Sequence, residues 1–320
     1  MDLSVVVPLY NEEANLEALH AEVVAALDQL NLEWEAVYVD DGSSDSTYQV
    51  LERLAAQDKR IVGVRLRKNF GQTAAMSAGF DYSQGKVVVT MDGDLQNDPR
   101  DIAKLLAKLN EGFDIAAGWR FDRQDAFLSR KLPSRLANGL ISLITKVKLH
   151  DYGCTLKAFR REVVRNIRLY GEMHRFIPAI ASWMGVSIAE VPVNHRPRRA
   201  GKSKYGIGRT PRVLLDLITV KFLLSYVTRP IQIFGKWGLA AGAAGFLLAL
   251  YYTVMRLFWA EPMWGKPGVI LAVLLLFVGV QLISIGLLGE MQMRIYYETQ
   301  NKPIYTVRQV LNREEGRGCS

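Results

Sequence analysis

The chain has 320 residues, of which 49% are hydrophobic and 22% charged, enough for about two domains with buried cores. These values exclude a mainly disordered chain. Its 40 basic and 32 acidic residues give a net charge of +8, which favours anionic partners such as nucleotide phosphates, nucleic acid or anionic lipid. Two distant cysteines, Cys154 and Cys319, exclude a disulfide framework and a four-ligand zinc site.

Short apolar runs alternate with helical patterns in the first part of the chain. We expect strands near residues 3–8, 36–39, 61–66, 86–91 and 114–117, with helices near residues 12–30, 45–57, 72–82 and 99–109. This alternation predicts an α/β domain with a mostly parallel sheet covered by helices. No signal-peptide pattern precedes the first strand, so we expect residues 1–209 to form a cytoplasmic domain.

Polar side chains follow three of the predicted strands, where ligands of α/β sheets bind. They are Tyr10, Asn11 and Glu12, then residues 40–45, then residues 92–96. Asp92 and Asp94 are two apart, so in an extended chain their carboxylates point to the same side. Hard oxygen ligands of this kind suit Mg²⁺ or Mn²⁺, which would hold a diphosphate. A simple turn is the alternative, because Asp and Gly are common turn formers.

Other nucleotide-binding patterns are missing from the sequence. No Gly-x-Gly-x-x-Gly follows a strand, and the run 201–203 lacks the upstream glycine of a phosphate loop. Dehydrogenase and P-loop functions are therefore disfavoured.

Two long runs near the carboxyl terminus, residues 237–255 and 267–289, contain no charged side chain. As helices they would reach about 28 and 34 Å, enough to cross a bilayer. A buried hairpin in a soluble core is the alternative. Basic residues lie before the first run and after the second, which places both termini in the cytoplasm. We therefore expect an interfacial amphipathic helix over residues 210–230, a two-helix transmembrane hairpin over 231–292 and a cytoplasmic tail over 293–320.

Three ordered motifs, in residues 5–13, 40–45 and 91–96, together resemble glycosyltransferase family 2. The later runs 151–154, 198–205 and 288–290 are similar to its polyprenyl-phosphate branch, which includes bactoprenol glucosyltransferases and dolichol-phosphate mannose synthases. The resemblance implies a GT-A (Rossmann-like) fold, a nucleotide-sugar donor, Mg²⁺ or Mn²⁺, and a polyprenyl (undecaprenyl) phosphate acceptor at the inner membrane.

The resemblance also implies roles for individual residues. It assigns to the nucleoside Pro8, Tyr10, Glu12 and Asp41, and to the metal and diphosphate Asp92, Asp94 and Gln96. The residues that would contact phosphates are Arg120, Arg198 and Lys204, although residues 195–209 also suit a solvated basic loop near anionic lipid.

On the acceptor side, Asp151 is our candidate for orienting the acceptor or assisting its attack; a turn cap ahead of Gly153 is the alternative. Arg130 and Arg135 are candidates for binding the acceptor phosphate, against the alternative of an exposed basic helix face.

The resemblance implies a metal-dependent, inverting transfer of a sugar to polyprenyl phosphate, with Asp94, Asp151 and Arg120 as the expected catalytic residues. UDP-glucose is the expected donor, with mannose or amino-arabinose derivatives as alternatives. A membrane polysaccharide synthase is disfavoured because no Gln-x-x-Arg-Trp run occurs.

Two non-enzymatic classes are the alternatives to this prediction. Nucleic-acid binding is disfavoured because no aromatic platform interleaves with the basic residues. A transport or scaffold subunit explains the spans, but these lack charged residues and would conduct only as an oligomer. The spans are expected to anchor and assemble the enzyme, which is compatible with a homo-oligomer.

Overall fold

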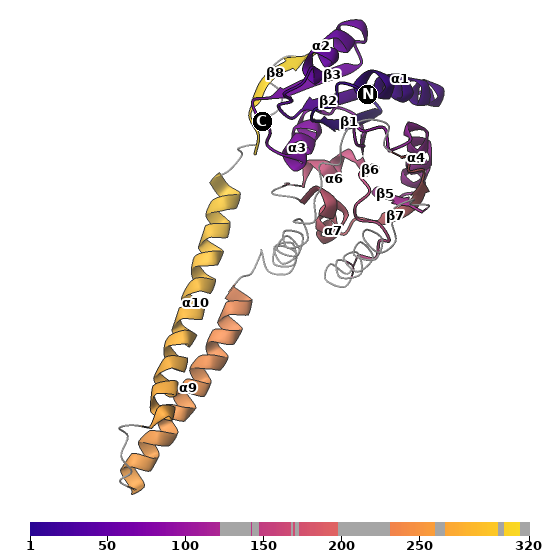
Figure 1. Cartoon of the computed structure of the whole chain (residues 1–320). Coiled ribbons are helices and arrows are strands. Elements are labelled where there is room, and N and C mark those ends of the chain that lie inside the picture. Colours follow the sequence, from indigo (N-terminus) through magenta and orange to yellow (C-terminus); the bar gives the residue numbers. More distant parts are fainter. Residues whose placement is uncertain are drawn as a thin grey trace. The chain divides into compact units, whose positions relative to one another are not determined.

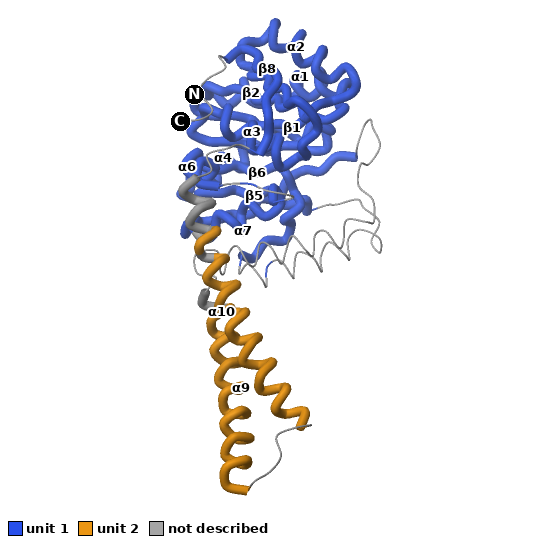
Figure 2. The backbone as a smooth tube through the Cα atoms, turned by 90° about the vertical axis from the view of Figure 1, so that its left-hand side faces the viewer, with its two compact units in different colours: residues 1–220, 302–320 blue, residues 221–301 orange. Residues whose placement is uncertain are grey.

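The structure is a computed structural model that describes residues 1–121, 142, 147–167, 169, 173–197, 231–259, 266–299 and 304–313. The chain divides into two compact units (Figure 2). Unit 1 comprises residues 1–220 and 302–320, and unit 2 comprises residues 221–301. The expected interfacial helix over residues 210–230 lies outside the described residues.

Unit 1 is built on a mixed sheet, with eight strands among the described residues in the order β7-β5-β6-β4-β1-β2-β3-β8 (Figure 1). The strands are β1 (Leu3–Leu9), β2 (Trp34–Asp40), β3 (Ile61–Leu66), β4 (Val87–Thr90), β5 (Ile115–Arg120), β6 (Lys157–Arg160), β7 (Ile188–Val193) and β8 (Val307–Leu311). Strands β3, β2, β1 and β4 are parallel, as are β5 and β7. Two strands run against their neighbours: β6 between β4 and β5, and β8 beside β3.

Helices cover both faces of this sheet because the side chains of β1 alternate in direction. The helices are α1 (Leu16–Leu27), α2 (Thr47–Gln57), α3 (Gln72–Tyr82), α4 (Ile102–Asn110), α6 (Arg161–Arg165) and α7 (Ile177–Ala181). Val5 and Val7 belong to the core that includes Leu19 of α1. Val6 lies on the opposite face against α3, where a Cβ on Gly79 would come within 2.1 Å of Val6 Cγ1. The predicted α/β domain and its parallel centre are thus confirmed.

The expected first helix, residues 12–30, is shorter than predicted, because residues 10–15 belong to the loop after β1. Strands β6, β7 and β8 were not predicted. Of these, β6 and β8 run antiparallel to their neighbours and make an otherwise parallel sheet a mixed one.

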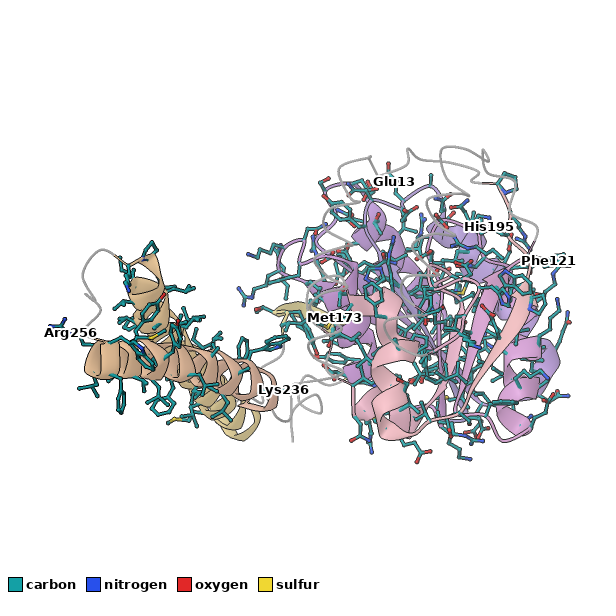
Figure 3. All side chains as sticks on the ribbon, turned by 90° about the horizontal axis from the view of Figure 1, so that it is seen from below. Glu13, Phe121, Met173, His195, Lys236 and Arg256 are labelled. Atoms are coloured by element: carbon teal, nitrogen blue, oxygen red, sulfur yellow. The ribbon has the colours of Figure 1, made fainter. Side chains whose placement is uncertain are left out.

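The antiparallel strand β6 determines which loops meet at one edge of the sheet. Lys157, the first residue of β6, pairs with Thr90 at the end of β4 and with Ala117 in β5. The amino end of β6 therefore lies beside the carboxyl ends of β4 and β5. Figure 3 shows Glu13, Phe121 and His195, from the loops after β1, β5 and β7, along one side of the unit.

Residues 304–313 are here called the C-terminal latch. They include β8, which pairs with β3 and is the last strand at the end of the sheet opposite to β7 (Figure 1). Tyr305 Oη donates to Asp81 Oδ2 at 2.7 Å, and Asn312 Nδ2 donates to the carbonyl of Ala55 at 2.7 Å. Arg313 Nη2 lies 2.6 Å from Oε2 of Glu35, which is 2% exposed. The latch covers the backbone groups that β3 would otherwise expose as an edge strand.

The latch lies within residues 293–320, for which we expected a cytoplasmic tail. Helix α10 (Pro267–Thr299) continues beyond residue 292, and residues 302–320 belong to unit 1. Residues Val307–Leu311 form strand β8 because β3 offers an edge with which they pair.

Unit 2 contains two long helices, α9 (Ile231–Trp259) and α10. Candidate membrane spans within them run over Phe234–Trp259 and Pro267–Gly289, with mean hydropathies of 1.6 and 2.7. Only 11% of each apolar window is buried, unlike the core helix of a soluble protein. Figure 3 shows Lys236 and Arg256 near opposite ends of α9, outside its apolar middle.

Small residues let α9 and α10 pack closely. A Cβ on Gly238 would lie 2.8 Å from the carbonyl oxygen of Gly279, and one on Gly245 would lie 2.8 Å from that of Ala272. This close approach is typical of helix pairs in membranes.

We predict that Arg313→Ala lowers the free energy of unfolding by about 3 kcal/mol or more, because it leaves the buried carboxylate of Glu35 without its cation. Arg308 is an exposed arginine of the same latch, and Arg308→Ala should change stability by less than about 0.5 kcal/mol. Denaturant unfolding of the detergent-solubilised protein measures both. Equal losses in the two variants would contradict a specific role for the Arg313–Glu35 pair.

Candidate active site

The loops after β1 and β2 are locked together by hydrogen bonds. Asn11, at φ 53°, donates from its backbone N–H to Ser43 Oγ at 2.9 Å and accepts from the Ser44 N–H at 2.8 Å. The N–H of Glu12 donates to Thr47 Oγ1 at 2.8 Å. An asparagine tolerates this left-handed conformation because its side chain bonds locally. The two loops therefore form one preorganised surface.

This surface brings together the residues predicted to bind the nucleoside. Pro8 pairs with Val39 across β1 and β2, and the Asp41 N–H donates to the Leu9 carbonyl at 2.8 Å. Tyr10 and Glu12 follow directly and are half-buried. The four predicted residues, Pro8, Tyr10, Glu12 and Asp41, thus lie at adjoining strand ends. Their contact with a nucleoside stays a prediction.

Asp41 also orders the loop over residues 67–71. Its side chain is 3% exposed, and its two oxygens accept the N–H groups of Phe70 at 2.7 Å and Gly71 at 2.9 Å. Burial raises the pKa of Asp41 to about 6, although the two backbone N–H groups lower it in part. Gly42 has φ 65°, and a Cβ there would lie 2.4 Å from the Lys68 carbonyl carbon, so the loop packs where only glycine fits.

Asp92 at the end of β4 is held from two sides. Gln72 Nε2 donates to Asp92 Oδ1 at 2.9 Å, and Thr155 Oγ1 donates to Asp92 Oδ2 at 2.6 Å. Desolvation and repulsion from Asp94 raise the pKa of Asp92 to about 6. Two neighbouring carboxylates that disfavour each other's charge make a suitable cradle for a cation.

Asp94 and Gln96 complete the predicted metal-binding run. Asp94 is 7% exposed, and its Oδ1 accepts the Gln96 N–H at 3.2 Å. Between them, Leu95 is buried at φ 61°, an unusual conformation for leucine that is typical of functional loops. Gln96 Nε2 faces the Arg196 carbonyl at 3.3 Å, so the amide oxygen is the end that remains for a cation.

These residues fit a hard divalent cation. Within the described ranges, no group of three or more His, Cys, Asp or Glu side chains forms a complete protein cage. Mg²⁺ sites commonly use one or two carboxylates and leave the other positions to substrate phosphates and water. Two aspartates with one amide oxygen match that pattern.

Arg120 and Asp151 form a two-pronged ion pair at the same edge. Arg120 Nε lies 2.6 Å from Asp151 Oδ2, and Arg120 Nη2 lies 2.9 Å from Asp151 Oδ1. The carboxylate of Asp151 raises the pKa of Arg120, although burial opposes this. Asp151 Oδ1 also accepts the Gly153 N–H at 3.0 Å, so Asp151 forms the turn cap that was the alternative to a catalytic role. Both roles are compatible with this geometry.

Some of the predicted site residues lie outside the described residues, and some residues that organise the observed site were not predicted. Arg130, Arg135, Arg198 and Lys204 lie outside the described residues. The pattern missed three side chains that organise the site: Gln72, Thr155 and Lys157. Thr155 directly follows the run 151–154, which was the only sequence signal for it. Gln72 and Lys157 carry no motif of their own.

Comparisons with known proteins give a consistent result. A family model, Glycosyl transferase family 2, matches residues 4–168. A dodecaprenyl-phosphate galacturonate synthase of Rhizobium johnstonii is 43% identical over 316 residues, covering 98% of this chain and 94% of that protein. An undecaprenyl-phosphate 4-deoxy-4-formamido-L-arabinose transferase of Shewanella sediminis is 38% identical over 320 residues, covering 99% and 95%.

Among solved structures, glucosyl-3-phosphoglycerate synthase from Mycobacterium tuberculosis, in complex with Mn²⁺, UDP and phosphoglyceric acid, is similar with a TM-score of 0.54. The match has 20% sequence identity and covers 70% of this chain and 78% of that one. At this identity the likeness concerns the fold alone, and it confirms the expected GT-A (Rossmann-like) architecture.

We predict that Asp41 makes the unliganded protein less stable as the pH rises. Its pKa is higher in the folded chain, so its contribution is complete below about pH 4 and is lost as the pH rises through about 6. The free energy of unfolding of Asp41→Asn should therefore rise relative to the unsubstituted protein between pH 5 and 7. Denaturant unfolding across this range measures the difference, and parallel pH profiles would contradict it.

Proposed function

The chain belongs to glycosyltransferase family 2, and from this premise we propose that it transfers a sugar from a nucleotide-sugar donor to polyprenyl phosphate. The observation that carries the proposal is that two groups of residues, here called half-sites, meet at one edge of the sheet. Asp92 and Asp94 follow β4, while the Arg120–Asp151 pair joins the end of β5 to the loop before β6. Such an arrangement suits a diphosphate on one side and a second substrate on the other.

Asp92, Asp94 and Gln96 are the residues that would hold Mg²⁺ or Mn²⁺. When bound, the cation would neutralise charge that develops on the departing nucleoside diphosphate. The protein's own contribution is to keep two carboxylates and one amide oxygen oriented before the donor arrives. The choice between the two metals is left to experiment.

In the transfer, an oxygen of the acceptor phosphate attacks the anomeric carbon while the bond from that carbon to the diphosphate breaks, which inverts the configuration. A phosphate monoester has a second pKa near 6, so its oxygen is already ionised at neutral pH and needs no strong base. We assign Asp151 an orienting role, because both its oxygens are engaged by Arg120. Arg120 offsets the charge of Asp151 where an anionic acceptor approaches.

For the donor we propose UDP-galacturonate, with UDP-4-deoxy-4-formamido-L-arabinose as the second candidate. The support is the names of the two relatives, 43% and 38% identical over nearly the whole chain. Neither of these two relatives is named for glucose, so UDP-galacturonate replaces UDP-glucose as the proposed donor. An amino-arabinose derivative, which was an alternative from the sequence, remains the second candidate.

We also propose that the protein is anchored in the inner membrane with unit 1 in the cytoplasm. The two apolar helices support the anchoring. The latch supports the topology, because residues 307–311 can pair with β3 only if the chain returns to the compartment of β3 after an even number of crossings. The basic residues that flank the hairpin indicate that this compartment is the cytoplasm.

We expect vesicles that contain the full chain and undecaprenyl phosphate to form a lipid-linked sugar fastest from UDP-galacturonate when Mn²⁺ or Mg²⁺ is present. Mass spectrometry of the lipid extract compares this donor with UDP-4-deoxy-4-formamido-L-arabinose, UDP-glucose and GDP-mannose. A preference for the formamido sugar would select the second candidate. Absence of product from every donor would overturn the proposed transfer.

We predict that Asp94→Ala lowers the rate of transfer by about 10²-fold or more, because it removes one of the two carboxylates that would hold the cation. Asp2→Ala is the control. Asp2 directly precedes β1 and pairs with the exposed Lys86, so removing the Asp2 carboxylate should leave transfer unchanged. Initial rates at saturating donor measure both variants. Full activity of Asp94→Ala with unchanged metal dependence would exclude the assignment.

A further inference from the structure

We propose that Thr155 is a positioning residue that couples the donor side of the site to the acceptor side, an inference that rests on the proposed function. Its side chain holds Asp92, and its backbone belongs to the loop over residues 151–156 that begins with Asp151. A shift of this loop would therefore move both half-sites together.

The hydroxyl of Thr155 fixes the Asp92 carboxylate in one orientation. Thr155 Oγ1 lies 2.6 Å from Asp92 Oδ2, a short distance typical of a hydroxyl that donates to a charged oxygen. Gln72 Nε2 holds the other oxygen at 2.9 Å. With one donor on each oxygen, rotation of the carboxylate would break at least one hydrogen bond.

Both donors are uncharged, and this matters for binding a cation. An arginine or lysine paired to Asp92 would neutralise the charge that attracts the metal. A hydroxyl and an amide orient the carboxylate and leave its negative charge in place. In many metal sites, residues that do not bind the metal donate hydrogen bonds to the ligands. These hydrogen bonds orient the ligands and strongly affect the affinity of the site for the metal.

The loop that carries Thr155 is braced along its length. At its start, Asp151 is held by Arg120, and the Asp151 N–H donates to Glu190 Oε1 at 3.0 Å. At its end, Thr90 Oγ1 donates to the Thr155 carbonyl at 2.6 Å.

The middle of the loop is held by Lys157, the first residue of β6, which is 3% exposed. Its ammonium group donates to the carbonyls of Tyr152 and Cys154. Burial lowers the pKa of Lys157. The two carbonyl oxygens that accept from its ammonium group give this buried lysine a structural role in the loop. These contacts make the loop a rigid link between Asp92 and Asp151.

The test compares Thr155→Val with Thr155→Ser in the full chain. Valine keeps the branched shape and removes the hydroxyl, whereas serine keeps the hydroxyl. We expect Thr155→Val to weaken Mn²⁺ binding in the presence of UDP by about 10- to 100-fold, measured by electron paramagnetic resonance of free Mn²⁺. We expect kcat to fall by a similar factor, UDP binding without metal to stay unchanged, and Thr155→Ser to restore both values.

Ser83→Ala is the control, because it removes a side-chain hydroxyl that donates a hydrogen bond in unit 1, from the buried Ser83 Oγ to the Phe80 carbonyl, outside the site. Its metal binding and kcat should equal those of the unsubstituted protein. Unchanged Mn²⁺ binding in Thr155→Val, or equal losses in Thr155→Val and Thr155→Ser, would overturn the inference while metal-dependent transfer by the unsubstituted protein upholds the function. Absence of transfer by the unsubstituted protein would instead refute the proposed function.

Discussion

The antiparallel insertion of β6 between β4 and β5 is the constraint on which the site depends. In a purely parallel sheet, the loop that enters β6 would lie at the opposite edge from the loop that leaves β4. Because β6 runs against both neighbours, Thr155 and Lys157 arrive beside Asp92. The same reversal lets Arg120 at the end of β5 reach Asp151. One strand direction thus joins two half-sites.

Gathering acidic side chains at one edge has an electrostatic cost that the protein compensates in two ways. Asp151 is paired with a cation, Arg120, which leaves its charge locally balanced. Asp92 is held by the neutral groups of Gln72 and Thr155 and faces the repulsion of Asp94, so its pKa rises. Asp92 and Asp94 are also the two carboxylates where the sequence predicted a metal. The difference between the two aspartate environments follows from the partners that the fold supplies to each.

The sequence allowed a good prediction of the parallel centre of the sheet, because β1, β2, β3 and β4 are apolar runs separated by strong turn signals. It also predicted which loops hold Asp41, Asp92 and Asp94, since polar residues directly follow those strands. Strand β6 could not be predicted in the same way: its Lys157, Ala158 and Phe159 show no clear alternation, and its partners are set by tertiary pairing. Gln72 and Thr155 are ordinary residues whose importance appears only once β6 and α3 are placed beside β4.

The latch shows that unit 1 is made of two separate stretches of the chain. Residues 1–220 alone would lack β8, so β3 would become an exposed edge and Glu35 would lose Arg313. The latch also contacts the loop over residues 67–71, which carries Phe70 and Gly71, since the Arg67 N–H donates to the Thr306 carbonyl at 2.9 Å. Cutting the chain before α9 therefore removes more than an anchor. The chain leaves unit 1, runs through α9 and α10 of unit 2 and returns with β8, so the described sheet is complete only after both helices have been passed.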